Sequence, residues 1–528
     1  MYGVAPAADA VAETSNSCAV VHLPIVWRRL YREGMTADSR PSIAIIGTGF
    51  GGIGMAAQLT QAGYHDFVIF EKADDVGGVW RDNEYPGAEC DVPSHLYSFS
   101  FALKPDWSRR FAGQDEILGY LNDCANRFDL RGNIRFGTEV LGAAFDETTG
   151  EWVLDLGGGQ THRANILIAA TGQLSRPAYP RIDGIDGFAG TMFHSSTWDH
   201  DYEFEGKKVA VIGTGASAVQ FVPHIAHRAA SLELFQRHAP HVLVKPDYPY
   251  RRGAIAAFTR FPALLKASRL ATYAWLEPRG FAFNGSTMGK VFISLAEKRY
   301  LRSLKKQIAD PELRRKVTPT DPMGCKRILM SNDYYPALVR DHVDVVTEGI
   351  ERIESDGVVT ADGKLHEVDT IVLGTGFAAT EFLSPMTVTG LGGEDLNDAW
   401  SGGAQAYLGI TVAGFPNFFM LYGPNTNLSH NSIVYMLESQ FAYIVDAVRE
   451  IDRSGAGWLT VRQDVEDAYN ADIQRQLGTT VWATGCDGWY TTAAGKNTQN
   501  WPGFTFTYRS VTREFDPNAY ASPGASHA

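Results

Sequence analysis

The chain has 528 residues, of which 45% are hydrophobic and 20% charged, as in a globular protein with two to four compact units. Its formal net charge of −13 argues against nucleic acid as a partner. No apolar run reaches the ~20 residues that cross a bilayer, so we expect no membrane span. The five cysteines form no CxxC pair. This argues against a disulfide framework, a cysteine-rich zinc site and a redox dithiol, and favours a cytoplasmic location. We expect no metal site.

The first folded unit is expected to begin after an N-terminal extension, residues 1–40. A β-branched run at residues 42–46 leads into a turn with small residues at Gly47, Gly49 and Gly52. A strand, a glycine-rich turn and a helix in this order bind the pyrophosphate of a dinucleotide at the helix N-terminus. A closing strand is expected at residues 164–172, which end in Thr-Gly.

A second segment repeats this pattern. Residues 208–212 form another β-branched run, and the turn that follows has small residues at Gly213, Gly215 and Ala218. Its closing strand, residues 368–376, also ends in Thr-Gly. One glycine motif alone is weak evidence, but two copies with matching closing strands predict two dinucleotide sites. The expected fold class is therefore α/β, with two Rossmann-like, three-layer dinucleotide-binding domains.

The order of the segments predicts that one domain is nested in the other. Residues between the two parts of the second unit have no strand–turn pattern, and show basic and apolar helical stretches at 263–273 and 293–308. We read this region as a helical insertion. The predicted division is first domain 41–180, second domain 181–240, helical insertion 241–325, second domain resumed 326–380, and first domain resumed 381–528.

The residue that ends the second strand of each unit indicates which nucleotide is bound. Glu71 lies 24 positions after Gly47, and a carboxylate there accepts hydrogen bonds from a free ribose, as in FAD or NAD. Arg237 lies 24 positions after Gly213 and is suited to a 2′-phosphate, which predicts NADPH. The alternative for Arg237 is an exposed surface arginine. Two such sites suggest hydride transfer from NADPH to a bound flavin.

Two further motifs lie between and beside these turns. The stretch Phe188-x-Gly190-x-x-x-His194-x-x-x-Trp198 follows the first unit, and Gly77-Gly78-x-Trp80-x-x-x-x-Tyr85-Pro86-Gly87-x-x-x-Asp91 lies within it. With the two glycine turns, these motifs resemble those of type I Baeyer–Villiger monooxygenases, in the class B flavin-containing monooxygenase family. The resemblance spans residues 41–378.

The resemblance implies roles for particular residues. Gly78, Trp80 and Asp91 belong to the FAD site, with NADPH in the second domain. Arg327, oriented by Asp91, stabilises a C4a-peroxyflavin, and Lys326 reaches the NADPH 2′-phosphate beside Arg237. His194 lies in a linker and is hydrogen-bonded to backbone. Trp489 corresponds to a tryptophan that contacts the nicotinamide ribose. For Trp489 a core position is equally compatible, and Trp501 is the alternative contact.

The implied activity is the conversion of a ketone to an ester or lactone with O2 and NADPH. Three alternatives remain open: oxygenation of sulfur or nitrogen by the same flavin, an NADPH oxidase or reductase, and a non-catalytic NADPH-sensing module. The sequence indicates a small-molecule substrate without identifying the ketone, and is compatible with a monomer or a homodimer.

Overall fold

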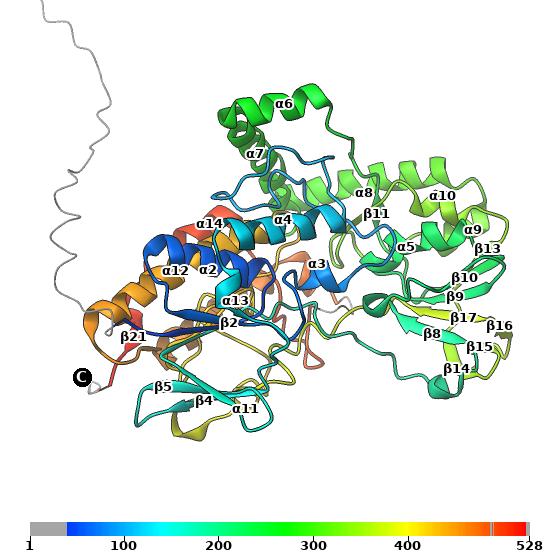
Figure 1. Ribbon diagram of the computed structural model, residues 1–528. Coiled ribbons are helices and arrows are strands. Elements are labelled where there is room, and N and C mark those ends of the chain that lie inside the picture. Colours follow the sequence, from blue (N-terminus) through cyan, green and yellow to red (C-terminus); the bar gives the residue numbers. More distant parts are fainter. Residues whose placement is uncertain (1–39, 486–487, 489, 524–528) are drawn as a thin grey trace, which may run out of the picture. The chain divides into compact units, whose positions relative to one another are not determined.

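Two parallel five-stranded sheets form the framework of the structure, a computed structural model that describes residues 40–485, 488 and 490–523 (Figure 1). The first sheet has the order β19-β7-β1-β2-β3, with bounds β1 Ile43–Ile46, β2 Phe67–Phe70, β3 Ile134–Arg135, β7 Ile166–Ala169 and β19 Phe418–Met420. The second has the order β13-β10-β9-β17-β8, with bounds β8 Thr191–His194, β9 Lys208–Ile212, β10 Ser231–Phe235, β13 Val343–Val346 and β17 Thr370–Leu373.

Both faces of the first sheet are buried, because alternate residues of a strand point to opposite faces. On one face, Ile43 and Ile45 pack in a core cluster with three helices. On the other face, Ala44 and Ile46 pack in a second core cluster with a four-stranded sheet. These helices are α2 Phe50–Ala62, α4 Gln114–Arg127 and α12 Ile433–Ser454. The four-stranded sheet consists of β4 Gly142–Asp146, β5 Glu151–Asp155, β6 Thr161–Ala164 and β18 Thr387–Thr389.

The second sheet is layered in the same way. Val209 and Val211 of β9 pack against helices, whereas Ala210 and Ile212 pack against a three-stranded antiparallel sheet. The helices on this face include α5 Ala216–Ala226 and α10 Tyr334–Leu338, and the small sheet consists of β14 Ile350–Glu354, β15 Gly357–Thr360 and β16 Leu365–Glu367. The predicted fold, two Rossmann-like domains with three layers each, is confirmed.

Both predicted closing strands are present. β7 pairs with β1, and β17 pairs with β9, so each lies directly beside the strand that leads into a glycine turn. β19, from the C-terminal part of the chain, pairs with β7 and completes the first sheet at its edge. Parallel neighbours place the carboxyl ends of these strands, and hence both turns, at the edge where dinucleotides bind in such folds.

Helices make up most of the predicted insertion. They are α6 Arg252–Arg260, α7 Pro262–Leu276, the 3-10 helix η5 Glu277–Ala282, α8 Thr287–Gln307 and α9 Pro311–Lys316. Two local signals explain where α8 and α9 begin: Ser286 Oγ accepts a hydrogen bond from Gly289 N (3.0 Å), and Asp310 Oδ2 accepts one from Leu313 N (2.7 Å). Among the described residues, no helix is both long and apolar enough to span a membrane.

The segment around His194 differs from the expected linker. Residues 191–194 form β8, which pairs with β17 at the edge of the second sheet. The predicted backbone contact is present, since His194 Nδ1 accepts a hydrogen bond from Ser196 N (3.1 Å). Three of the four residues of β8 are partly exposed, as expected for a strand at the edge of a sheet.

Candidate functional site

One cavity of about 1790 Å³ has both glycine-rich turns in its wall. Most of the predicted site residues line it: Gly47, Gly49, Glu71, Gly78, Trp80, Asp91, Gly213, Gly215, Arg237, Lys326 and Arg327. Gly52 and Ala218, predicted to bind the cofactors, do not line it. They lie behind the turns, where small side chains let each helix pack closely on its strand.

The first glycine-rich turn leaves no room for a side chain at two of its glycines. Gly47 has a φ of +100°, and a Cβ atom there would lie 2.7 Å from the carbonyl oxygen of Ala170. A Cβ atom at Gly52 would overlap the carbonyl oxygen of Gly47. Helix α2 begins directly after Gly49, which offers no side-chain cap, so its first N–H groups are available to a phosphate.

The second turn has the same geometry. Gly213 has a φ of +110°, and α5 begins after Gly215, again without a side-chain cap. A Cβ atom at Gly215 would meet nothing closer than the carbonyl oxygen of Gly374, at 3.9 Å. Open space therefore lies in front of this turn, and an anionic group can approach the helix N-terminus.

Glu71 is held at the end of β2 by the backbone around it. The side chain is buried, and its Oε2 accepts hydrogen bonds from Thr48 N (3.0 Å) and Thr48 Oγ1 (2.6 Å). Its Oε1 accepts one from Ala73 N (3.0 Å) and pairs with Arg81 Nη1 (3.2 Å). Glu71 thus fixes the glycine turn as well as facing the cavity. Arg81 was not predicted, because only its place within the Gly77–Asp91 motif marks it.

Arg237 and Lys326 lie in the wall beside the second turn. Arg237 is exposed and forms no ion pair within the described part of the chain. Lys326 Nζ pairs with Asp321 Oδ2 (2.7 Å), and the same carboxylate oxygen lies 4.0 Å from Nδ1 of His238. The unpaired guanidinium is therefore the stronger candidate for a phosphate, and Asp321 partly neutralises Lys326.

Asp91 and Arg327, 236 positions apart in the chain, meet in the cavity wall. Arg327 Nη2 lies 3.4 Å from Asp91 Oδ2. Burial opposes the charge of Arg327, but Asp91, with smaller contributions from Tyr490 and Tyr422, raises its pKa above the usual value. The guanidinium therefore stays charged at every working pH.

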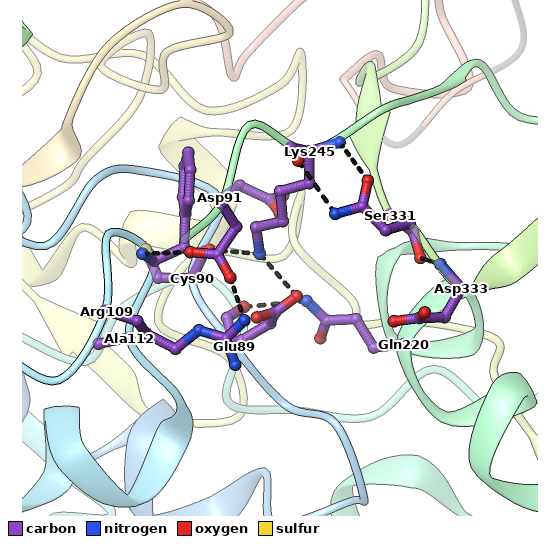
Figure 2. A network of polar contacts seen from close by, with 12 residues as sticks. Glu89, Cys90, Asp91, Arg109, Ala112, Gln220, Lys245, Ser331 and Asp333 are labelled. Carbon is purple, nitrogen blue, oxygen red and sulfur yellow. Dashed lines mark hydrogen bonds and ion pairs between the residues drawn. The ribbon is translucent and has the colours of Figure 1, made fainter. Parts of the chain in front are cut away.

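A buried lysine supports the segment that carries Asp91 (Figure 2). Lys245 Nζ pairs with Glu89 Oε1 (2.7 Å) and donates to the carbonyl oxygen of Cys90 (2.9 Å). From helix α5, Gln220 Nε2 donates to the carbonyl oxygen of Glu89 (2.9 Å). The loop before Asp91 is thus fixed by the insertion and by the second unit together. Sequence reasoning missed Lys245, since nothing in its neighbourhood marks it.

Three residues that were not predicted also line the cavity: Tyr422 from the C-terminal half, and Gln173 and Asn83 from the first unit. Tyr422 has a φ of +60°, unusual for an aromatic residue, and its carbonyl oxygen accepts a hydrogen bond from Gln173 Nε2 (2.8 Å). Gln173 Oε1, and Oδ1 of Asn83, are buried with no hydrogen-bond partner among the described residues. Because buried polar atoms normally have a hydrogen-bond partner, these two oxygen atoms indicate that this part of the cavity wall is suited to a polar ligand.

Aromatic residues were predicted at three positions. Trp80 lines the cavity, and its Nε1 donates to the hydroxyl of Tyr97 (3.1 Å). Trp489 lies outside the described residues. Trp501 is buried in a core cluster, with its Nε1 donating to the carbonyl oxygen of Phe504 (3.0 Å), and does not line the cavity. Trp501 is therefore a core residue, which argues against it as the alternative contact, and the role of Trp489 stays a prediction.

Cys325 directly precedes Lys326 and is disulfide-bonded. One bonded cysteine does not make a disulfide framework, which the sequence argued against. Cys90 and Cys124 are free and buried. Burial raises the pKa of the Cys90 thiol to about 12, so it stays protonated and unreactive near neutral pH.

Comparison with known proteins agrees with this geometry. Residues 40–280 match the flavin-binding monooxygenase-like family. A Baeyer–Villiger monooxygenase of Pseudomonas aeruginosa is 48% identical over 480 residues, covering 90% of each chain, and one of Streptomyces coelicolor is 43% identical, covering 90% of this chain and 92% of its own.

Solved structures show the same fold. OTEMO, crystallised in complex with FAD and NADP, is 28% identical, has a TM-score of 0.82, and is matched over 92% of this chain and 100% of its own. Closed cyclohexanone monooxygenase is 27% identical, has a TM-score of 0.81, and is matched over 92% and 99%. The identity and coverage of the curated relatives, together with this fold, show that the chain belongs to the Baeyer–Villiger monooxygenase family.

Proposed function

We propose that this chain is an NADPH-dependent flavin monooxygenase that uses O2 to convert ketones to esters or lactones. The observation that carries this proposal is the single cavity shared by two dinucleotide-type turns, with the Arg327–Asp91 pair in its wall. Relatives named Baeyer–Villiger monooxygenase, and a fold shared with structures that hold FAD and NADP, support it.

FAD is assigned to the first turn and NADPH to the second. Gly47 and Gly49 leave room for the FAD pyrophosphate at the N-terminus of α2, and Glu71 suits its free ribose. Gly213 and Gly215 do the same for NADPH, with Arg237 and Lys326 at the 2′-phosphate. When bound, the flavin reduced by NADPH supplies the electrons that activate O2.

Arg327 is the proposed catalytic residue. Oxygen insertion places negative charge on oxygen atoms in the cavity, and a fixed guanidinium stabilises that charge without needing to be protonated first. Asp91 holds the guanidinium in place. Lys245, which supports the loop before Asp91, acts as a positioning residue.

The test is Arg327→Ala, assayed with NADPH, ¹⁸O2, a ketone and a thioether. We expect the variant to bind FAD and to be bleached by NADPH, but to form about 10²–10³-fold less ester, the usual cost of losing one charge-stabilising group. Arg315→Ala, an exposed arginine on α9, is the matched control.

Each alternative predicts a different product. Normal ester yield from Arg327→Ala removes this residue from the mechanism. Sulfoxide without ester from the unmodified chain indicates a heteroatom oxygenase, and NADPH oxidation without ¹⁸O in any product indicates an oxidase or reductase. A chain that binds no flavin contradicts the enzyme proposal altogether. The domain limits, the monomeric or dimeric state and the cytoplasmic location stay predictions.

A further inference from the structure

The helical insertion differs in charge from the rest of the chain. Residues 251–316 contain 15 Lys and Arg but only 4 Asp and Glu, a net charge of +11. The whole chain carries −13, so the remainder carries −24. Figure 1 shows α6, α7 and α8 in green, grouped outside the two parallel sheets. A positive surface on a strongly negative chain selects an anionic partner.

Helix α8 turns an apolar face to the exterior. Met288, Val291, Phe292 and Leu295 are 68%, 56%, 48% and 61% exposed. Their spacing of i, i+3, i+4 and i+7 places them on one side of the helix. The opposite side is anchored, because Tyr300 and Leu304 are buried in the core cluster of the second unit. The exposed side chains are therefore a fixed surface, and no element within the described residues 40–485, 488 and 490–523 covers its four apolar members.

The same face becomes basic along α8. Its continuation in the i, i+3, i+4 pattern consists of Lys298, Arg299, Arg302 and Lys306, all exposed. One helix thus presents about two apolar turns followed by two basic turns. Long basic side chains beside exposed apolar ones suit the boundary between lipid headgroups and acyl chains.

Helix α7 also exposes apolar side chains. Leu264 and Leu270 are 48% and 66% exposed. Trp275, near its end, is 39% exposed, with the guanidinium carbons of Arg279 at 3.9 Å and Arg110 at 4.5 Å from its ring centroid. A tryptophan flanked by arginines is amphipathic in the way that membrane-interface residues are.

We propose that α7 and α8 bind the surface of an anionic lipid bilayer. The apolar turns enter the headgroup–acyl boundary, about 5–10 Å deep, and the basic residues pair with anionic headgroups. A second copy of the chain is a poor occupant, because its insertion, with a net charge of +11, would be repelled by the same charge on this surface. Residues 1–39 carry 3 basic and 4 acidic residues and offer no matching charge. A nucleic acid would match the charge but leave the apolar face uncovered.

The test is co-sedimentation of the flavin-loaded, full-length protein with phosphatidylglycerol–phosphatidylcholine vesicles and with pure phosphatidylcholine vesicles. We expect binding to the anionic vesicles only, weakened by salt. Lys298→Glu with Arg299→Glu lowers the partition by about thirtyfold or more, at roughly fivefold per basic residue. The charge-matched control is Lys364→Glu with Arg513→Glu, two exposed positions outside the insertion.

A second pair of variants isolates the apolar contribution. Val291→Ser with Phe292→Ser leaves the net charge unchanged, and we expect it to lower the partition by at least about tenfold. Val339→Ser with Val511→Ser, exposed elsewhere, is its control. Circular dichroism and flavin content verify the folding of every variant.

Three outcomes would overturn the proposal. The first is no sedimentation with anionic vesicles, or equal sedimentation with both vesicle types. The second is full retention by the serine pair while the charge reversal releases the protein, which means that any polyanion is bound. The third is a concentration-dependent dimer that the serine pair dissociates, without vesicle binding, which means that a second copy covers the face.

Discussion

The two glycine-turn units have nearly the same backbone and differ at single positions. Each has a β-branched strand, a first glycine at a φ of +100° or +110°, an uncapped helix and an adjacent closing strand. The strand that follows is succeeded directly by Glu71 in the first unit and, after Gln236, by Arg237 in the second. The shared backbone therefore provides for a pyrophosphate, and the residue after the second strand selects the ribose.

The units also differ in how closely the helix approaches the turn. Gly52 in the first unit leaves no room for a Cβ atom, whereas Ala218 in the second is accommodated and fully buried. Gly52→Ala is therefore expected to have the largest effect: loss of bound FAD and a fall of roughly 3 kcal/mol or more in unfolding free energy. Absorbance at flavin wavelengths and urea denaturation measure both.

The reverse change completes this comparison. Ala218→Gly is expected to cost only about 1 kcal/mol, the usual difference between the two residues in a helix, and to leave FAD bound. Equal losses from the two substitutions would contradict the interpretation that only the first turn is closed to a Cβ atom.

The second unit alone carries the insertion, and Glu277 of η5 ties it to the C-terminal part. Its carboxylate accepts hydrogen bonds from Thr505 N (2.7 Å), Thr505 Oγ1 (2.8 Å) and Asn431. Burial opposes ionisation, but His430, whose Nε2 lies 3.6 Å from Oε2, and the hydrogen bonds from Thr505 and Asn431 lower the pKa of Glu277 from 4.5 to about 2. The folded protein therefore binds this proton less readily than the unfolded chain does.

Glu277→Gln is expected to lower the unfolding free energy by about 3 kcal/mol at pH 7. Because the folded pKa is the lower one, this contribution is complete above pH 4.5 and is lost as the pH falls toward 2. Urea denaturation of both proteins at pH 7 and at about pH 3.5 gives the two differences. A difference in unfolding free energy that is larger at the lower pH would contradict this reasoning. Glu312→Gln, at an exposed position on α9, is the control.

Arg237→Glu places an acid in the second unit where the first already has one. We expect the KM for NADPH to rise about 10–100-fold, the worth of a charged hydrogen bond to the 2′-phosphate, with little change for NADH. Steady-state kinetics with both cofactors measure this. An equal rise for NADH would mean that Arg237 does not recognise the phosphate, and Arg513→Glu is the control for net charge.

Lys326→Ala tests the weaker of the two cations. Because Asp321 already pairs with Lys326, the expected rise in the KM for NADPH is only about fivefold, again without a change for NADH. A larger effect than that of Arg237→Glu would reverse the assigned order of the two residues. Asp321→Asn, which frees the ammonium group, is expected to lower the KM.

Local patterns allowed much of the fold to be predicted, because β-branched runs and glycine turns act over a few residues. The helical insertion was also predictable from periodicity and composition. The two smaller sheets, one antiparallel and one mixed, were not, since strands such as Glu151–Asp155 are short and half-exposed. Their place over the parallel sheets depends on tertiary packing that no single segment encodes.

The site was predictable where a motif marks it and not elsewhere. Glu71 and Arg237 followed from matched spacing, whereas the Asp91–Arg327 pair was expected only through the family resemblance. Lys245, Gln173 and Tyr422 reach their positions through contacts with residues far away in the chain. A sequence pattern cannot show such contacts, because each partner looks ordinary in its own segment.

The uneven charge of the chain has a consequence for handling the protein. With +11 concentrated in residues 251–316 and −24 elsewhere, the molecule is a strong electric dipole despite a sequence pI of about 5.6. It should adhere to cation-exchange as well as anion-exchange resins near neutral pH, each time through a different part of its surface.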